Sequence, residues 1–211
     1  MLKQFKKALV LAPHTDDGEF GCGGTIARLA ESGCEVHYVA FSSCEESVPA
    51  GFPKDILVTE VKKATEVLGV KPEHLRVLNY KVRMFSYHRQ EILDDILKIK
   101  KQVNPDVIFI PSQNDIHQDH TTITTEAIRA AKGCSIFCYE LTWNNFDFNN
   151  ACFVALEEKH INKKIEAINQ YASQGHRPYA DVEFLKGQAR VRGVQSGGSY
   201  AEAFEIIRLL L

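Results

Sequence analysis

Short apolar segments that alternate with longer amphipathic ones constrain the fold of this chain more than any other feature of its sequence. Residues 8–12 (ALVLA) and 105–111 (PDVIFIP) are almost continuously apolar, which is typical of strands buried on both faces of a sheet. Residues 35–42 and 135–141 have the same character, and residues 74–80 are a further strand candidate.

The segments between these strands have helical spacing. Residues 23–33, 55–70 and about 119–131 are predicted helices, and residues 89–103 place isoleucines on one stripe with charges elsewhere. Because parallel strands need helical crossovers between them, the pattern predicts an α/β fold. We expect a Rossmann-like, doubly wound and mostly parallel sheet with helices on both faces.

The length of the chain indicates a single domain. With 211 residues, of which 45% are hydrophobic, the chain can fill one core well and is short for two. From about residue 151 the alternation is less regular, but no linker or repeat sets this part off. We therefore expect one domain over residues 1–211, in which the part from about 151 completes the sheet and forms a wall of the site.

The charge balance argues against a function that depends on a basic surface. The formal net charge is −2, with lysines and arginines scattered among the acids, so nothing attracts nucleic acid or an anionic membrane over long range. No segment approaches the roughly 20 apolar residues of a membrane span. The six cysteines include no C-x-x-C pair, which favours free thiols in a reducing compartment. We expect a cytoplasmic protein that acts on a small molecule, and a homo-oligomer remains open.

Two polar clusters follow two of the predicted strands. The first, residues 13–17 (PHTDD), leaves the strand at 8–12, and the second, residues 111–120 (PSQNDIHQDH), leaves the strand at 105–110. Ligands of open α/β sheets bind outside the carboxyl ends of the strands, so we expect both clusters to meet in one crevice. The nearby glycines do not match G-x-G-x-x-G, and no dinucleotide cofactor is predicted.

His14, Asp17 and His120 form a candidate metal site. Two imidazoles and one carboxylate leave positions open for water and substrate, as a catalytic zinc site requires. The same set of ligands serves non-haem iron oxygenases, so Fe²⁺ or another divalent metal is the alternative to Zn²⁺.

Asp16 and His117 are candidates for proton transfer at that metal. Adjacent residues in a loop diverge, so Asp16 points away from Asp17 and can act as a base toward a water molecule. His117, one turn from His120, can donate a proton to a leaving group or stabilise an oxyanion. The simpler interpretation of each cluster alone is a helix start, with Asp119 as an N-cap.

Taken together, these residues resemble the PIG-L/LmbE-like family of zinc-dependent N-deacetylases. The family motif A-H-P-D-D-E is similar to Pro13-His14-Thr15-Asp16-Asp17-Gly18, and H-P-D-H is similar to His117-Gln118-Asp119-His120. The resemblance implies the following roles: His14, Asp17 and His120 as zinc ligands, Asp16 as general base, His117 as the group that assists the oxyanion and the leaving amine, and Asp119 as a residue that tunes His117.

The sequence departs from these motifs at three positions. Gly18 stands where the motif has glutamate, although Glu19 follows directly, and Thr15 and Gln118 replace prolines. None of these changes removes a proposed ligand or the base, so they bear on substrate orientation more than on catalysis.

The resemblance implies a metal-dependent hydrolase that removes an acetyl group from an N-acetylated amino sugar or sugar conjugate and releases acetate. Arg83 and Asp115 are candidate substrate contacts, and Trp143, Phe146 and Phe148 are available to stack on a sugar. Two other functions remain open: an iron oxygenase that uses the same site, and a nucleotide-sugar binding module without turnover.

Overall fold

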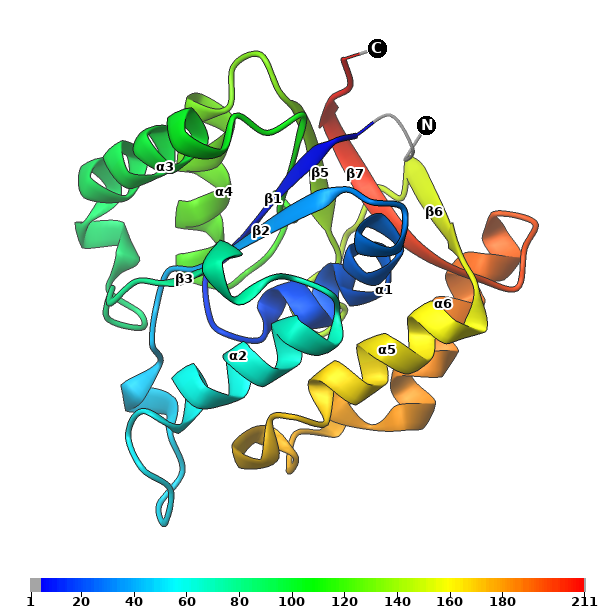
Figure 1. Ribbon diagram of the computed structural model, residues 1–211, viewed down its shortest axis with the longest axis horizontal. Coiled ribbons are helices and arrows are strands. Elements are labelled where there is room, and N and C mark those ends of the chain that lie inside the picture. Colours follow the sequence, from blue (N-terminus) through cyan, green and yellow to red (C-terminus); the bar gives the residue numbers. More distant parts are fainter. Residues whose placement is uncertain (1–4, 211) are drawn as a thin grey trace.

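Seven strands form one sheet in the computed structural model, which describes residues 5–210. Their order across the sheet is β3-β2-β1-β4-β5-β7-β6 (Figure 1). The first five strands in this order are parallel, whereas β7 runs antiparallel to both β5 and β6. The strands are β1 (Lys7–Ala12), β2 (Glu35–Ala40), β3 (Leu75–Val77), β4 (Val107–Pro111), β5 (Ser135–Tyr139), β6 (Cys152–Leu156) and β7 (Tyr200–Arg208).

Helices cover both faces of this sheet. On one face α3 and α4 pack against one apolar core, and on the other α1, α2, α5 and α6 pack against a second core (Figure 1). The helices are α1 (Asp17–Glu31), α2 (Ile56–Val67), α3 (Arg89–Val103), α4 (Gln118–Ala130), α5 (Glu158–Ile168) and α6 (Val182–Gln195). The predicted α/β fold is therefore confirmed.

Residues beyond 151 supply the antiparallel edge of the sheet and two of its helices. β7 lies between β5 and β6 in the sheet: Tyr200–Phe204 pair with β6, and the residues from Phe204 to Arg208 pair with β5. None of the helices within residues 5–210 combines the length and apolarity that crossing a membrane requires.

The start of α1 differs most from the sequence prediction, which placed it at residue 23. The helix begins at Asp17 and is kinked at Cys22, whose φ of −145° is not helical. The kink releases backbone donors of the following turn, and the carboxylate of Glu202 on β7 accepts them from Gly24 (3.0 Å) and Thr25 (2.7 Å). A remote strand thus caps the second half of this helix, which no local sequence pattern indicates.

The four glycines of α1 lower its helix propensity, but two of them allow the close packing that stabilises the helix. A Cβ atom on Gly18 would lie 2.5 Å from Cε2 of Tyr38, and one on Gly21 would lie 2.2 Å from Cδ2 of Tyr139. The missing side chains let α1 approach the sheet closely enough to cover two buried tyrosines. The departure from the motif at Gly18 therefore has a packing reason, because Tyr38 fills the space of a larger side chain.

Candidate metal centre

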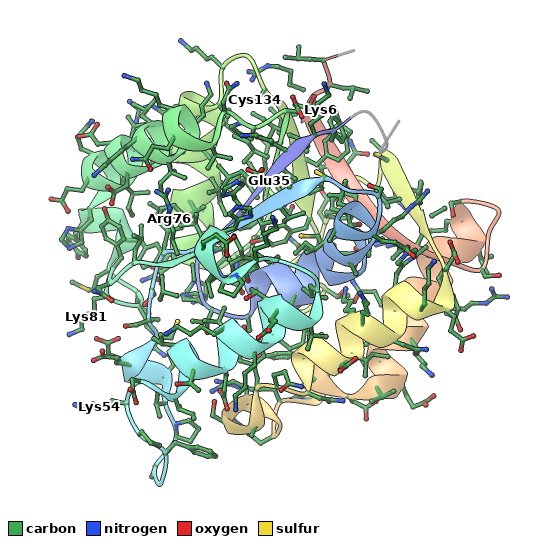
Figure 2. The ribbon with its side chains drawn as sticks, viewed as in Figure 1. Lys6, Glu35, Lys54, Arg76, Lys81 and Cys134 are labelled. Carbon is green, nitrogen blue, oxygen red and sulfur yellow. The ribbon has the colours of Figure 1, made fainter. Side chains whose placement is uncertain are left out.

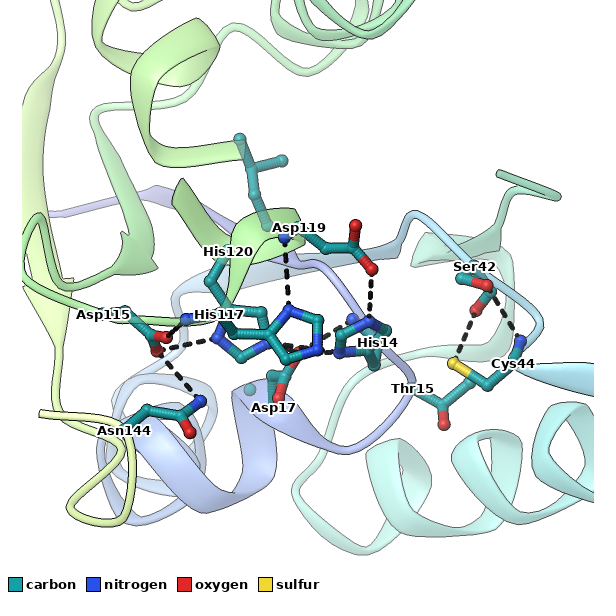
Figure 3. Close-up of polar contacts among 12 residues, drawn as sticks. His14, Thr15, Asp17, Ser42, Cys44, Asp115, His117, Asp119, His120 and Asn144 are labelled. Carbon is teal, nitrogen blue, oxygen red and sulfur yellow. Dashed lines mark hydrogen bonds and ion pairs between the residues drawn. The ribbon is translucent and has the colours of Figure 1, made fainter. Parts of the chain in front are cut away.

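The two polar clusters of the sequence meet at the carboxyl ends of β1 and β4. These strands are neighbours, and the chain builds outward from them in opposite directions, to β2 and β3 on one side and to β5 on the other. Such a switch point leaves a crevice between the loops that follow the two strands. The residues after β1 and those after β4 face each other there (Figure 3).

His14, Asp17 and His120, called the metal cluster below, bring three ligand atoms together. Asp17 Oδ2 lies 3.2 Å from His14 Nδ1 and 3.2 Å from His120 Nε2, and the two ring nitrogens are 3.1 Å apart. Ligands at about 2.0–2.1 Å from a tetrahedral zinc ion lie about 3.3 Å from one another. The triangle therefore fits a single ion with little rearrangement.

His117 is a second candidate for the third ligand. One ring nitrogen each of His14, His117 and His120 lies within 4.8 Å of the others. The Nδ1 atom of His117 accepts the backbone N–H of Asp119 at 3.2 Å, which leaves Nε2 free to face the cleft. The shorter and more even distances favour Asp17 as the ligand and His117 as a neighbouring donor group.

Two buried carboxylates hold the imidazoles of the metal cluster from behind. His14 Nε2 lies 3.1 Å from Asp119 Oδ2, and His120 Nδ1 lies 2.7 Å from Asp115 Oδ2 (Figure 3). A carboxylate on one ring nitrogen fixes the tautomer and turns the lone pair of the other nitrogen toward the metal. The donor set and its supporting carboxylates could hold a metal ion.

These contacts bear on two sequence predictions. The carboxylate of Asp119 contacts His14 instead of His117, and it also accepts the backbone N–H groups of Arg83 (2.6 Å) and Phe85 (3.3 Å). Asp115, a predicted substrate contact, is only 4% exposed and does not line the cleft. Its burial behind a ligand is a tertiary feature that sequence spacing cannot reveal.

The electrostatics of the metal cluster favour a positive charge at its centre. Burial lowers the pKa of His14, but Asp17 and Asp119 outweigh it and raise that pKa to about 9. Burial likewise opposes protonation of His120, whose pKa Asp17 and Asp115 raise to about 10. Protons on the two rings stand in for the charge that a divalent cation would supply, and a bound cation would displace them.

Asp16 and His117 flank the metal cluster and differ in charge. Burial, and then the carboxylate of Asp17, raise the pKa of Asp16 to about 6, so its carboxylate is largely ionised at neutral pH and still basic. Burial and the neighbouring histidines His120 and His14 lower the pKa of His117 to about 4, which keeps this ring neutral. Both side chains line the cleft.

The cleft above the metal cluster has a volume of about 350 Å³. Its walls combine the stacked rings of Trp143 and Tyr179, 3.9 Å apart at 11°, with the arginines Arg83 and Arg177. Arg83, a substrate contact in the sequence prediction, lines the cleft. Arg177 and Tyr179 come from the irregular region beyond residue 151, and no motif pointed to them.

Phe146 and Phe148 do not line the cleft, contrary to the prediction. Phe146 is 87% exposed, and the ring of Phe148 lies 5.7 Å from the guanidinium of Arg192. Of the three aromatic residues in that loop, only Trp143 is placed to meet a ligand.

Comparison with known proteins finds deacetylases similar to this chain in sequence and in structure. The family model PIG-L, described as GlcNAc-PI de-N-acetylase, matches residues 9–132, which include both polar clusters. The diacetylchitobiose deacetylase of Thermococcus kodakarensis is 29% identical over 199 residues, which are 90% of this chain and 68% of that protein. The solved structure of the N,N'-diacetylchitobiose deacetylase from Pyrococcus horikoshii, bound to an inhibitor, has a TM-score of 0.82 and 26% identity and covers 98% of this chain and 85% of that one.

The same fold also carries another activity. The 4-carboxy-2-hydroxymuconate hydratase from Pseudomonas putida KT2440 has a TM-score of 0.78 and 21% identity, and the match covers 98% of both chains. At this identity the likeness shows the fold alone. The activity must therefore be argued from the site residues.

Proposed function

Because the chain belongs to the PIG-L family of de-N-acetylases, we propose that it is a metal-dependent hydrolase that removes an acetyl group from an N-acetylated amino sugar or sugar conjugate. The observation that carries this proposal is the triangle of His14, Asp17 and His120 ligand atoms with the carboxylate of Asp16 beside it. An oxygenase has no need of this additional base.

The metal cluster would hold the cation, and its two nitrogens and one oxygen suit Zn²⁺, with Fe²⁺ as the alternative. When bound, a divalent cation polarises the carbonyl oxygen of an acetamide and lowers the pKa of a water molecule. Asp119 and Asp115 hold the two imidazoles in the orientation that this binding requires.

Asp16 moves the proton in this proposal. It accepts a proton from the water whose oxygen attacks the acetyl carbon, and its pKa of about 6 makes it a base at neutral pH. As the C–N bond breaks, Asp16 returns that proton to the nitrogen. The carboxylate of Asp16 is regenerated, and the products are acetic acid and an amine, which at neutral pH are present as acetate and an ammonium group.

His117 stabilises the negative charge that develops on the acetyl oxygen. Its Nδ1 accepts from the Asp119 backbone, so the neutral ring carries its proton on Nε2. That N–H is a hydrogen-bond donor for the oxyanion, which is one of the two roles that the sequence indicated. The lowered pKa argues against the other role, in which a protonated His117 supplies the proton for the amine.

The substrate would lie along the aromatic wall of the cleft. The stacked Trp143 and Tyr179 offer an apolar face for a sugar ring, and Arg83 and Arg177 offer donors for its hydroxyl groups or for an acidic substituent. A cleft of about 350 Å³ is of the size that binds small ligands.

Acetate release from N,N'-diacetylchitobiose and from N-acetylglucosamine tests the proposal. We expect turnover that a chelator abolishes and that added Zn²⁺ restores. The Asp16→Asn variant should lose about 10²–10⁴-fold in kcat with its metal content unchanged. The variant Asp55→Asn, at an exposed carboxylate, serves as the control. Full activity of Asp16→Asn would refute the assignment of the base, and oxygen consumption without acetate would favour the oxygenase.

A further inference from the structure

A second group of metal-ligand side chains lies away from the cleft. Glu35 and His37 are two residues apart on β2 and therefore lie on the same face of the sheet. His74 ends the short helical turn Pro72–His74 and precedes β3, where the parallel register sets Leu75 opposite Tyr38 and so brings His74 beside His37. One ligand atom of each of the three side chains lies within 4.8 Å of the others.

The three side chains of this group lie close to one another. His37 Nε2 lies 2.7 Å from Glu35 Oε1, and the rings of His37 and His74 stack with centroids 4.1 Å apart at 26°. Among residues 5–210, nothing forms a hydrogen bond with the buried Nδ1 atom of His74. A buried ring nitrogen without a partner is unfavourable, and a cation at this position would satisfy it.

The charges around the group permit a cation. Glu35 Oε1 places a carboxylate oxygen beside the His37 ring, and burial, together with the nearby His74, lowers the pKa of that ring. Lys7 Nζ competes for Glu35 at 3.6 Å, but its side chain is 43% exposed and can turn into solvent. Arg76, the other nearby cation, lies on the same face two residues after His74, and its guanidinium donates to Gln102 rather than to Glu35 (Figure 2 labels Glu35 and Arg76).

The group is independent of the metal cluster. It lies at the amino ends of β2 and β3, whereas the metal cluster lies at the carboxyl ends of the strands. Since β2 rises by about 3.3 Å per residue, the two sites are roughly 15–20 Å apart. They share no residue.

We propose that Glu35, His37 and His74 bind a second divalent cation of the zinc class, which ties the edge strand β3 to β2. Two imidazoles and one carboxylate favour Zn²⁺, Co²⁺ or Ni²⁺ over Mg²⁺ and Ca²⁺, which prefer oxygen ligands. β3 has only three residues, and the segment after it carries Val82 and Arg83 into the cleft. A cation here stabilises the sheet edge that supports one wall of the cleft.

Zinc stoichiometry of the metal-free full chain tests this proposal. Titration with ZnCl₂, followed by calorimetry and by elemental analysis after dialysis, should give two equivalents for the wild type. The His37→Ala/His74→Ala variant should bind one equivalent, and the His14→Ala/His120→Ala variant should also bind one. The control is His88→Ala, because His88 pairs with Glu91 at 2.6 Å in an exposed contact outside both groups, and it should keep two.

Further measurements guard against a variant that does not fold. In the His14→Ala/His120→Ala background, Co²⁺ should produce the visible absorption of a low-symmetry nitrogen and oxygen site, and Glu35→Gln should weaken its binding at least tenfold. Zinc should also raise the melting temperature of this background by several degrees, and Glu35→Gln should remove most of that rise. One equivalent in the wild type, or Co²⁺ binding that Glu35→Gln leaves unchanged, would overturn the proposal. Failure of the deacetylase assay would not bear on it.

Discussion

The Asp115→Asn variant tests whether Asp115 supports the candidate metal ligand His120 or contacts the substrate, as the sequence suggested. The carboxylate is buried and accepts from His120 at 2.7 Å and from the backbone N–H of His117 at 2.8 Å. The amide of asparagine can still accept from the backbone. When the side-chain oxygen of asparagine accepts from the backbone, its NH2 group faces Nδ1 of His120, so two donors face each other. The variant also removes the negative charge beside the ring that would bind the metal.

The expected loss is in metal affinity. Removing a carboxylate behind a metal-ligating histidine weakens metal binding about 10–100-fold, which corresponds to about 1.4–2.7 kcal/mol. This range agrees with the cost of about 1–3 kcal/mol for leaving a buried donor without its acceptor. With excess zinc, kcat should recover most of its value, and KM for the substrate should stay within about twofold.

Competition with a chromogenic zinc chelator measures the affinity, and acetate release at low and at saturating zinc measures kcat and KM. Asp94→Asn, at an exposed carboxylate on α3, is the matched control and should leave both unchanged. A rise in KM with wild-type zinc affinity would refute the reasoning and would return Asp115 to the substrate.

Three further outcomes are expected. The two imidazoles of the metal cluster have pKa values raised to about 9 and about 10. Their contribution to the stability of the metal-free protein is therefore complete below about pH 6.5 and is lost as the pH rises through 9–10. Melting curves from about pH 6 to 10 should show this loss, and zinc should suppress it. Gly18→Ala should lower the free energy of unfolding in urea by about 1–3 kcal/mol, because its Cβ would lie 2.5 Å from Cε2 of Tyr38. Gly175→Ala, whose Cβ would have no contact closer than 3.7 Å, should change that free energy by less than about 0.5 kcal/mol. Trp143→Ala should raise KM about two- to tenfold, from the loss of a stacking contact worth about 0.5–1.5 kcal/mol. Phe146→Ala, at a side chain that is 87% exposed, should leave KM unchanged, and equal KM values for the two variants would contradict the proposed aromatic wall.

Much of the fold was accessible from the sequence because the signals for it are local. The continuous apolar runs at β1 and β4 and the isoleucine stripe of α3 reflect burial on both faces of a sheet and on one face of a helix. The kink of α1 at Cys22 was not accessible, because Glu202, a residue far along the chain, accepts the backbone donors that follow it. Local propensity carries no trace of such a contact.

The sequence by itself determined the α/β class, the two loops that carry the chemistry and the candidate ligands, since residue types and strand ends are properties of short segments. Only the tertiary structure decided which groups support those ligands. It assigned Asp119 to His14 and Asp115 to His120, and it brought Tyr179 from beyond residue 151 against Trp143. These pairings depend on how parallel strands place their ends side by side, and contacts between residues distant in the chain form only when the whole sheet has assembled.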